Sequence, residues 1–487
     1  MRDSFDLLIV GGGINGAAIA RDAAMRGLQV LLVERDDLAQ HTSSASSKLI
    51  HGGLRYLEQG ALRLVRESLR EREILLRTAP HIVRPLRFVL PQGEGGRPWW
   101  MLRSGLTLYD LLAGRSALPR SRSLAAGETA FIAPLRKPGR AALYHDAWVD
   151  DARLVVLNAL AAAEHGAEIA TRTTLLSARR DGEAWTVELS AGRQVCARAI
   201  VNAAGPWVAD VLTSRIGRNS ASRVRLIKGS HIVVPRLYDG DHAYILQQPD
   251  GRVVFALPHG EHNLIGTTDI PVERPEDATI TPDEIAYLCA AVNLYFEGQT
   301  GPGDVRWSYS GVRSLHDDGA ASAQAVTRDY HLELDDGPGP KLLSVFGGKI
   351  TTARALADRA LGKLGSRGRC RTRHAYLPGG EMDDMWDDSH EEFLATIDRW
   401  IDPKLSLRLA CSYGARIANL LGTAGSTADL GRHFGADLYQ LEVDYLRRVE
   451  WARTADDILW RRTKLGLKMS PAECEQLDAY LAARDTS

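Results

Sequence analysis

Three glycines near the N-terminus have the spacing of a loop that binds a dinucleotide. Gly11, Gly13 and Gly16 follow the apolar run Phe5–Val10 and open a segment rich in helix formers. In such a loop the first glycine permits a tight turn, the second lets the backbone approach a pyrophosphate, and the third lets helix and strand pack closely. Glu34 ends the next apolar run, at the distance expected for a carboxylate that binds a ribose hydroxyl. We therefore predict a dinucleotide site, although the loop alone does not distinguish FAD from NAD.

A second polar segment offers hydroxyl side chains. The run Thr42–Ser47 suits close hydrogen bonding to a pyrophosphate or to the edges of a bound ring. Composition alone would favour a flexible serine linker. The adjoining sequence His51-Gly52-Gly53-Leu54-Arg55 favours a ligand-contacting loop instead.

The stretch from Thr42 to Tyr56 resembles the flavin-contacting loop of the FAD-dependent (respiratory, aerobic-type) glycerol-3-phosphate dehydrogenases, within the D-amino-acid-oxidase-like flavoprotein superfamily. Further segments resemble the same family, in order along nearly the whole chain. These segments are Trp148–Leu154, Asn202–Trp207, Ile227–His231, Ile265–Asp269, Tyr309–Arg313, Ser344–Thr352 and, in the C-terminal domain, Thr454–Gly466. The departure from the pattern is Ser314 after Arg313, where we would expect proline.

The resemblance implies FAD as cofactor, sn-glycerol 3-phosphate as substrate, dihydroxyacetone phosphate as product and a membrane quinone as electron acceptor. Oxidation would transfer a hydride from C2 of the substrate to the flavin. A phosphate dianion is held best by planar, permanently charged guanidinium groups. Arg313 is our first candidate for binding the phosphate and Arg55 is the second, and we expect Tyr56 to contact the substrate as well.

His231 is the predicted base. A histidine accepts a proton near neutral pH without extreme tuning, and a well-placed base is worth roughly 10²–10⁴ in rate. Lys349 or an arginine could hold the alkoxide instead, so this assignment stays open. Lys349 follows Gly347-Gly348 at the start of a predicted helix, whose N-terminus would stabilise negative charge that develops on the flavin.

The predicted catalytic residues are thus His231, Arg313, Arg55 and Lys349, and the same four with Tyr56 are predicted to bind the substrate. The predicted cofactor-binding residues are Gly11, Gly13, Ile14, Asn15, Gly16, Glu34, Thr42, Ser43, Ser44, Ser47, Lys48, Leu49, His51, Gly52, Gly53, Gly205, Gly348, Lys349, Ile350 and Thr351. The five cysteines lie far apart without a C-x-x-C pair, so we predict no metal site and a reducing compartment.

The strand–loop–helix–strand pattern of the first 40 residues and the family resemblance imply an α/β fold. We predict an FAD-binding Rossmann-like domain of the glutathione-reductase or D-amino-acid-oxidase type, an inserted antiparallel-sheet substrate domain and a C-terminal helical domain. The predicted ranges are 1–85, 144–215 and 340–370 for the FAD-binding domain, 86–143 and 216–339 for the substrate domain, and 380–487 for the C-terminal domain.

Hydrophobic patterns support this division. Around the glycine loop we predict a helix over Ala17–Arg26 and a second strand over Gln29–Glu34. Ala199–Ala203 and Leu342–Phe346 are predicted as further strands of the same sheet. Residues 224–270 and 330–346 show short runs with turn signals, which indicate antiparallel hairpins. Thr454–Gly466 is predicted as one helix, capped by Thr454, with Arg461, Arg462 and Lys464 in its last turn.

The length and charge of the chain limit the number of domains and the kinds of partner to expect. The chain has 487 residues, enough for roughly three domains. Its 60 basic and 61 acidic side chains give a net charge of −1, so we expect no nucleic-acid partner. No run of about 18 apolar residues occurs, which argues against a membrane-spanning helix. The N-terminal apolar run leads directly into the glycine loop and is therefore predicted as a strand and not a signal peptide.

Two segments are typical of contact with a membrane surface. Arg97–Arg115 combines a broad apolar face with Trp99 and Trp100 near its start, the pattern of an interfacial helix. Ile350–Leu364 is also amphipathic, and the basic residues Arg367, Arg369, Arg371 and Arg373 follow it. Two ordinary helices that cover a core are the alternative interpretation. Because a quinone acceptor is dissolved in lipid, we predict a cytoplasmic protein attached peripherally to the inner face of the cell membrane.

Several alternatives stay open at this stage. An oxidase of the same family would pass electrons to O2, and other members of the superfamily oxidise amines or 2-hydroxyacids. A non-catalytic sensor would bind FAD without being reduced by glycerol 3-phosphate. The sequence leaves open whether the protein is a homodimer.

Overall fold

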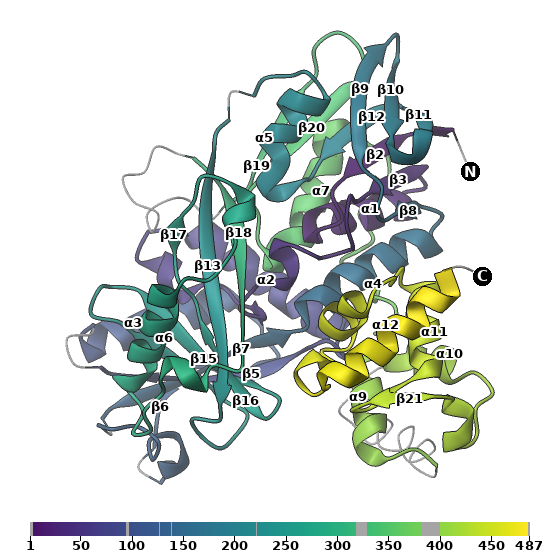
Figure 1. The fold of residues 1–487 in the computed structure, drawn as a ribbon. Coiled ribbons are helices and arrows are strands. Elements are labelled where there is room, and N and C mark those ends of the chain that lie inside the picture. The colour runs from purple at the N-terminus through teal and green to yellow at the C-terminus, as the bar shows by residue number, and fades with distance from the viewer. Residues whose placement is uncertain are drawn as a thin grey trace.

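The computed structural model describes residues 3–93, 97–125, 127–137, 139–220, 222–317, 329–381 and 400–485. Within them, two large sheets and a mainly helical C-terminal region surround separate hydrophobic cores (Figure 1). The mixed α/β architecture confirms the predicted fold class. The domain limits stay predictions, and residues 318–328 and 382–399 of the predicted substrate and C-terminal domains lie outside the described ranges.

A six-stranded sheet collects strands that are far apart in the sequence. Its strands are β2 (Leu7–Val10), β3 (Val30–Val33), β8 (Glu168–Ala170), β12 (Ala199–Asn202), β19 (His331–Asp335) and β20 (Lys341–Phe346). Their order is β19-β20-β12-β2-β3-β8, and every pair is parallel except β19 with β20. The four predicted strands therefore do lie in one sheet. The hairpin predicted over 330–346 also forms, as β19 and β20.

Helices cover one face of this sheet. The glycine loop leads into α1 (Ile14–Met25), which packs between α4 (Asp151–Glu164) and α7 (Ala353–Leu364). Alanines on all three helices permit close approach, and they are buried in one cluster with the strand residues. The second face meets a smaller sheet around the buried Trp185. Its strands are β1 (Ser4–Phe5), β9 (Leu175–Asp181), β10 (Ala184–Leu189) and β11 (Gln194–Ala197).

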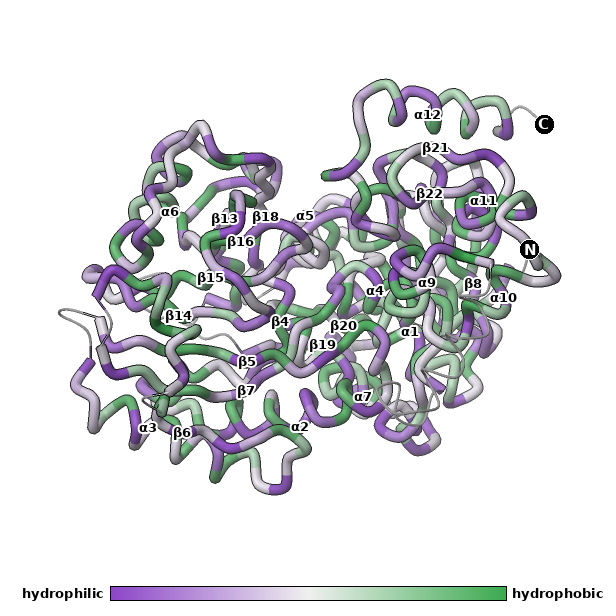
Figure 2. Tube along the Cα trace, turned by 90° about the horizontal axis from the view of Figure 1, so that it is seen from below, coloured by the Kyte–Doolittle hydropathy of each residue, from purple (hydrophilic) through white to green (hydrophobic). Residues whose placement is uncertain are grey.

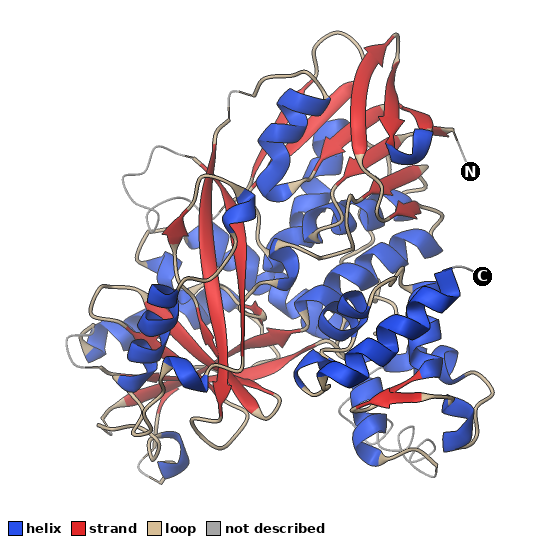
Figure 3. Cartoon of the chain, in the orientation of Figure 1, coloured by secondary structure: helices blue, strands red, loops and turns tan. Residues whose placement is uncertain are grey.

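In the second large sheet the hydrogen-bonded strands follow the order β17-β13-β16-β15-β14-β5-β7-β4. In addition, β18 pairs with β13, and β6 pairs with β7. Figure 3 shows the long red strands β13 and β18 that run beside each other along it. The strands are β4 (Leu49–Ile50), β5 (Val83–Pro91), β6 (Arg122–Ser123), β7 (Ala141–Val149), β13 (Val224–Pro235), β14 (Ala243–Gln247), β15 (Val253–His259), β16 (His262–Gly266), β17 (Ile270–Pro271) and β18 (Trp307–His316). The hairpins predicted within 224–270 are confirmed.

Three helices pack against this second sheet. They are α2 (Leu62–Thr78), α3 (Trp99–Ala113) and α6 (Pro282–Asn293). Among the described helices, none combines the length and the apolar character needed to cross a bilayer.

The C-terminal region has its own core and lies to one side of the molecule, away from α6 (Figure 2). Its elements are α9 (Pro403–Tyr413), α10 (Ile417–Leu421), β21 (His433–Gly435), β22 (Leu438–Tyr439), α11 (Gln440–Val449) and α12 (Pro471–Asp485). The prediction of one helix over Thr454–Gly466 was wrong in length. Thr454 does cap Asp457, but a π turn over Asp457–Arg462 follows, and Lys464 leaves the helix with a left-handed φ of 61°.

Candidate active site

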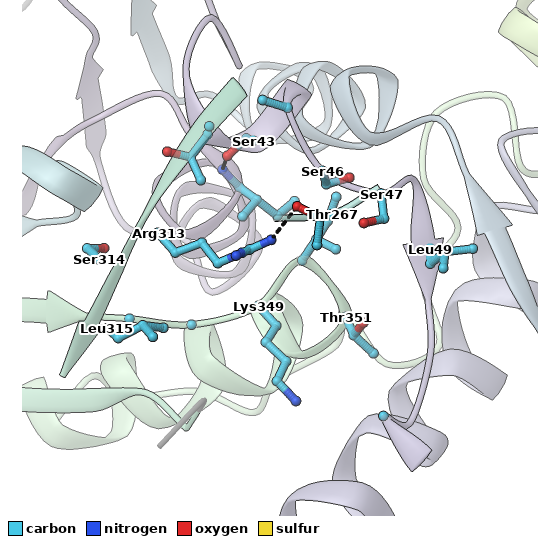
Figure 4. Close-up of a pocket in the computed structure, with 18 of the residues that line it drawn as sticks. Ser43, Ser46, Ser47, Leu49, Thr267, Arg313, Ser314, Leu315, Lys349 and Thr351 are labelled. Atoms are coloured by element: carbon cyan, nitrogen blue, oxygen red, sulfur yellow. Dashed lines mark hydrogen bonds between the residues drawn. The ribbon is translucent and has the colours of Figure 1, made fainter. Parts of the chain in front are cut away.

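A cavity of about 730 Å³ lies where the two large sheets meet. Segments from both sheets form its wall: the residues after β2 and β3, the serine loop (defined here as residues 42–48), β18, and the loop after β20. The volume is in the range of ~300–1,000 Å³ that is usual for cofactor and substrate clefts. Figure 4 shows part of this wall, with Ser43 and Ser47 of the serine loop, Arg313 of β18 and Lys349 of the loop after β20.

Most of the predicted site residues line this one cavity. They are Gly11, Gly13, Ile14, Asn15, Glu34, Thr42, Ser43, Ser47, Leu49, His51, Gly53, Arg55, Tyr56, Gly205, Arg313, Gly348, Lys349, Ile350 and Thr351. The remaining predicted residues, Gly16, Ser44, Lys48, Gly52 and His231, are not part of the lining. The structure thus brings most of the predicted cofactor-binding residues and most of the predicted substrate-binding residues to one cavity, while the role of each residue stays a prediction.

Steric contacts explain why the loop before α1 is built from glycine. Gly11 has φ 112°, and a Cβ on it would lie 2.5 Å from the carbonyl oxygen of Ala203. A Cβ on Gly16 would lie 1.9 Å from the carbonyl oxygen of Gly11. The backbone N–H of Ile14 donates to Ser43 Oγ at 3.0 Å, so the serine loop lies directly against the N-terminus of α1. Free N–H groups and positive potential at a helix N-terminus favour a bound phosphate.

Glu34 is buried at the end of β3 and faces the cavity. Its two carboxylate oxygens accept hydrogen bonds from the backbone N–H groups of Gly12, at 2.6 Å, and Asp36, at 2.9 Å. Burial raises the pKa of Glu34, and these two hydrogen bonds oppose the rise. Each carboxylate oxygen keeps a further lone pair, which can accept from a ribose hydroxyl.

The loop after β20 packs against Asn15, the second residue of α1. Gly347 and Gly348 have φ angles of 74° and 100°, and a Cβ on Gly348 would lie 2.8 Å from Asn15 Nδ2. Asn15 Nδ2 donates to the carbonyl oxygen of Gly347 at 3.1 Å. Among the described residues, the buried Asn15 Oδ1 has no hydrogen-bond partner. A buried acceptor of this kind is costly unless a ligand satisfies it.

Arg313 lies on β18 and points across the cavity wall. Its Nη1 donates to Asp269 Oδ1 at 2.6 Å, and its Nη2 donates to Thr267 Oγ1 at 3.2 Å, the dashed line in Figure 4. Sequence reasoning gave Asp269 no role, although it closes one of the segments that carry the family resemblance. The sequence signal was therefore present, but the contact depends on how β16 and β18 flank β13.

Lys349 and Tyr56 form a second cationic position. Lys349 Nζ lies 3.8 Å from the centroid of the Tyr56 ring. The Tyr56 ring packs onto Gly53, where a Cβ would lie 2.1 Å from Cε2. Burial, with a smaller contribution from the charge of Lys349, lowers the pKa of His51 to about 4, so His51 is neutral at physiological pH.

His231, the predicted base, lies behind the cavity wall. Its Nε2 is 2.8 Å from Ser47 Oγ, and its ring stacks on Tyr309 at a centroid distance of 4.8 Å. Burial first, and then the charges of Arg313 and Lys48, lower the pKa of His231 well below its usual value. His231 is therefore a neutral imidazole that reaches the cavity through the hydroxyl of Ser47.

A glycine loop at the start of a buried helix, an acid at the end of the next strand and an adjoining cationic wall are typical of a dinucleotide-dependent oxidoreductase.

Comparisons with known proteins specify the cofactor. Residues 6–354 match the family of FAD-dependent oxidoreductases, and residues 370–482 match the C-terminal domain of alpha-glycerophosphate oxidase. The chain belongs to the FAD-dependent oxidoreductase family, in the branch that carries this C-terminal domain. FAD fits the site described above, because the glycine cradle, Glu34 and the unsatisfied Asn15 oxygen offer partners for a pyrophosphate, a ribose and a ring.

Several individual relatives are named as dehydrogenases of polyol phosphates. A glycerol-3-phosphate dehydrogenase of Pseudomonas aeruginosa is 51% identical, over 99% of this chain and 96% of the relative. A D-erythritol 1-phosphate dehydrogenase of Brucella abortus is 49% identical, over 97% of this chain and 96% of the relative. The crystal structure of a glycerol-3-phosphate dehydrogenase of Bacillus halodurans complexed with FAD has a TM-score of 0.75 at 26% identity, and covers 100% of this chain and 91% of that one.

Proposed function

We propose that this protein oxidises sn-glycerol 3-phosphate to dihydroxyacetone phosphate, with FAD as the hydride acceptor and a membrane quinone as the next electron acceptor. The observation that carries the proposal is that two arginines, Arg55 and Arg313, line the same cavity as the dinucleotide loop. The relatives named for glycerol 3-phosphate support the choice of substrate.

Arg313 and Arg55 are the groups proposed to bind the phosphate. Guanidinium groups donate two parallel hydrogen bonds to phosphate oxygens and stay charged at any physiological pH. Asp269 and Thr267 hold the guanidinium of Arg313 in place before the substrate binds. The substrate then meets a preorganised donor, which lowers the entropy cost of binding.

The proton of the C2 hydroxyl leaves through the Ser47–His231 pair. Ser47 Oγ accepts it at the cavity wall and passes its own proton to His231 Nε2, 2.8 Å away. His231 is neutral before reaction and so has a lone pair for the proton, while its lowered pKa makes it a weaker base than an exposed histidine. Lys349 is the alternative group that would stabilise the substrate oxygen, since it lines the same cavity. FAD supplies the acceptor for the hydride that leaves C2.

The membrane proposal is supported by the surface of α3. Trp100 and Leu111 are 70% and 69% exposed, and Met101 and Leu108 are each 38% exposed. Trp100, Met101 and Leu108 also line the cavity, so the cavity extends to an exposed apolar surface. An apolar helix face of this kind suits shallow insertion into a bilayer. We propose that α3 rests on the cytoplasmic face of the cell membrane, with the quinone approaching there.

A second substrate deserves a direct test. The relative from Brucella abortus, 49% identical, is named for D-erythritol 1-phosphate, which is also a polyol phosphate with a secondary alcohol. The same two arginines would hold its phosphate, so the proposed chemistry does not distinguish the two compounds.

Anaerobic rapid mixing tests the proposal. The FAD-loaded protein is mixed with glycerol 3-phosphate, D-erythritol 1-phosphate or unphosphorylated glycerol, and the bleaching of the flavin absorbance is followed. We expect bleaching to be fastest with glycerol 3-phosphate and absent with glycerol. No bleaching with either phosphate would indicate a non-catalytic FAD-binding protein, and bleaching with glycerol would remove the phosphate-binding role. Reoxidation by a soluble quinone much faster than by O2, without hydrogen peroxide, would support the dehydrogenase over an oxidase.

A further inference from the structure

Three basic side chains of the C-terminal region reach acidic side chains next to the FAD site. Sequence reasoning explained Arg461, Arg462 and Lys464 as charges at the end of a helix. In the structure, Arg462 donates from both Nη atoms to the two carboxylate oxygens of Asp37, each at 2.9 Å, and Arg461 Nε donates to Asp37 at 2.7 Å. Lys464 Nζ lies 3.3 Å from Asp150 Oδ1. These contacts connect the C-terminal region to the segments that form the cofactor site.

Asp151, the neighbour of Asp150, binds the serine loop. Asp151 accepts from Lys48 Nζ and from Ser46 Oγ, both at 2.8 Å. Lys48 Nζ also donates to the carbonyl oxygen of Ser44 at 3.2 Å, and its backbone N–H donates to Ser46 Oγ at 2.9 Å. Lys48 has a left-handed φ of 57°, which a residue with a side chain adopts only when its surroundings hold it there. The loop conformation therefore depends on Asp151.

The serine loop in turn fixes the groups around His231. Ser47 Oγ is bonded to His231, and Tyr309 Oη donates to the carbonyl oxygen of Ser46 at 2.7 Å. Because Tyr309 also stacks on His231, a shift of Ser46 and Ser47 would move both partners of the imidazole ring.

The C-terminal region contacts the same strand from a second side. Trp460 stacks on Trp307, two residues before Tyr309 on β18, with ring centroids 4.4 Å apart. The carbonyl oxygen of Trp460 accepts from Lys464 Nζ at 2.9 Å. A Cβ on Gly466 would lie 2.5 Å from the Trp460 ring, so the turn after Lys464 leaves no room there.

Four charges balance one another in this interior. Lys48 and Asp151, whose side chains are only 3% and 0% exposed, form one ion pair, and Lys464 and Asp150 form a second. The cluster therefore holds two positive and two negative charges. Lys464 Nζ is also 3.8 Å from Asp151 Oδ1. His259 faces the same cluster, but burial and then the two lysines lower its pKa to about 3, so it adds no charge. Without Lys464, Lys48 would be the nearest cation for both aspartates, and it would be drawn away from Ser44.

We propose that Lys464 is a positioning residue of the active site: from the C-terminal region it holds Asp150 and leaves Lys48 and Asp151 free to fix the serine loop and, through Ser47, His231. The part of this statement that concerns His231 rests on the proposed function. The part that concerns the serine loop rests only on the FAD site.

Full-length protein loaded with FAD tests the proposal in four forms: the natural protein, Lys464→Met, the double variant Lys464→Met/Asp150→Asn, and the control Lys468→Met. Lys468 is an exposed lysine four residues further along, and asparagine preserves the helix cap that Asp150 provides for α4. The readouts are bound FAD per chain, the visible circular dichroism of that FAD, and the rate of anaerobic flavin reduction together with its dependence on substrate concentration.

We expect Lys464→Met to retain FAD, to change its circular dichroism, and to reduce flavin about 10- to 100-fold more slowly, as small displacements of reacting groups do. Its half-saturating substrate concentration should change less than the rate, because Arg313 and Arg55 are not touched. The double variant should recover most of the rate, since Lys48 then has one aspartate to bind. Lys468→Met should behave like the natural protein.

Other results would overturn the proposal. A rate and a circular dichroism in Lys464→Met equal to those of Lys468→Met would show that the loop does not depend on Lys464. If Lys464→Met does not fold, the double variant decides: a folded, FAD-loaded and fast double variant supports the charge balance, and a slow or unloaded one refutes it. If the natural protein is not reduced by either polyol phosphate, the proposed function fails, and the circular dichroism of bound FAD still tests whether Lys464 positions the loop.

Discussion

Arg313 is held by a carboxylate before any phosphate arrives. The Asp269 side chain is 11% exposed and the Arg313 side chain 29%, so the pair keeps access to the cavity while its geometry is fixed. The carboxylate orients the guanidinium, but it also repels an incoming dianion. In the proposed function, binding of the phosphate therefore depends on Arg313 and Arg55 together.

Replacing Arg313 should weaken substrate binding and leave the cofactor in place. Hydrogen bonds to a charged group contribute about 1.5–3 kcal/mol, so Arg313→Ala should raise KM about 10- to 100-fold. Steady-state kinetics and the flavin absorbance of the purified variant measure both effects. Arg306→Ala, an exposed arginine just before the same strand, is the matched control. An unchanged KM for Arg313→Ala would remove this residue from phosphate binding.

The loop between β2 and α1 leaves little room for side chains larger than glycine. A Cβ on Gly13 would lie 3.1 Å from Ser43 Oγ, and the γ-methyl groups of valine would extend into the space in front of the α1 N-terminus. Gly13→Val should therefore fold but lose most of its FAD, which the ratio of flavin to protein absorbance measures. Gly362→Val on α7, where no atom lies within 4 Å of the added Cβ, should keep its FAD. A fully yellow Gly13→Val would contradict the assignment of this loop.

If the exposed face of α3 contacts the membrane, a charge placed on it should weaken membrane binding. Burying a leucine side chain is worth about 1.5–3 kcal/mol, so Leu111→Glu should lower the binding to anionic liposomes about 10- to 100-fold. Co-sedimentation with vesicles measures this. Leu407→Glu replaces another leucine, 50% exposed on α9, and should bind as the natural protein does. Equal losses in both variants would mean that α3 is not the membrane-facing element.

Sequence patterns predicted the elements better than the contacts between them. The parallel strands β2, β3, β12 and β20 were predicted because their apolar runs are continuous and end at turn residues. The contacts of Arg461, Arg462 and Lys464 with Asp37 and Asp150 were not predicted. These basic residues have the same local sequence pattern whether they face water or reach a distant carboxylate. Likewise, His231 was predicted to touch the substrate. Only the packing of β13 beside the serine loop shows that Ser47 stands in front of it.

At the scale of the whole molecule, pH should affect how the C-terminal region stays docked. His81 is 3% exposed, and the turns at Gly379 and Gly414 pack against its ring. Neither ring nitrogen has a hydrogen-bond partner among the described residues, and burial followed by the charge of Arg153 lowers the pKa of His81 to about 3.

The sign of the effect follows from proton binding. Above pH 6.5 His81 is neutral in both the folded and the unfolded protein, and the pH has no effect through it. Below pH 6.5 the unfolded chain gains a proton on His81 that the folded protein does not accept until about pH 3. The free energy of unfolding therefore decreases by about 1.4 kcal/mol for each unit by which the pH is lowered, or about 2 kcal/mol in total at pH 5. The melting temperature should therefore drop between pH 7 and pH 5. His81→Gln should show a smaller drop, and an equal drop would rule out His81 as a source.

The order of strands in the six-stranded sheet has a consequence for synthesis of the chain. β2 lies in the middle of the sheet, but its neighbour β12 begins at residue 199 and β20 at residue 341. At the ~5–20 residues per second of a ribosome, the N-terminal strand pair waits on the order of ten seconds or more with one edge unsatisfied. The nascent chain therefore exposes an aggregation-prone strand edge until β12 has emerged, and FAD can find its complete binding surface only after residue 351 of 487 has emerged.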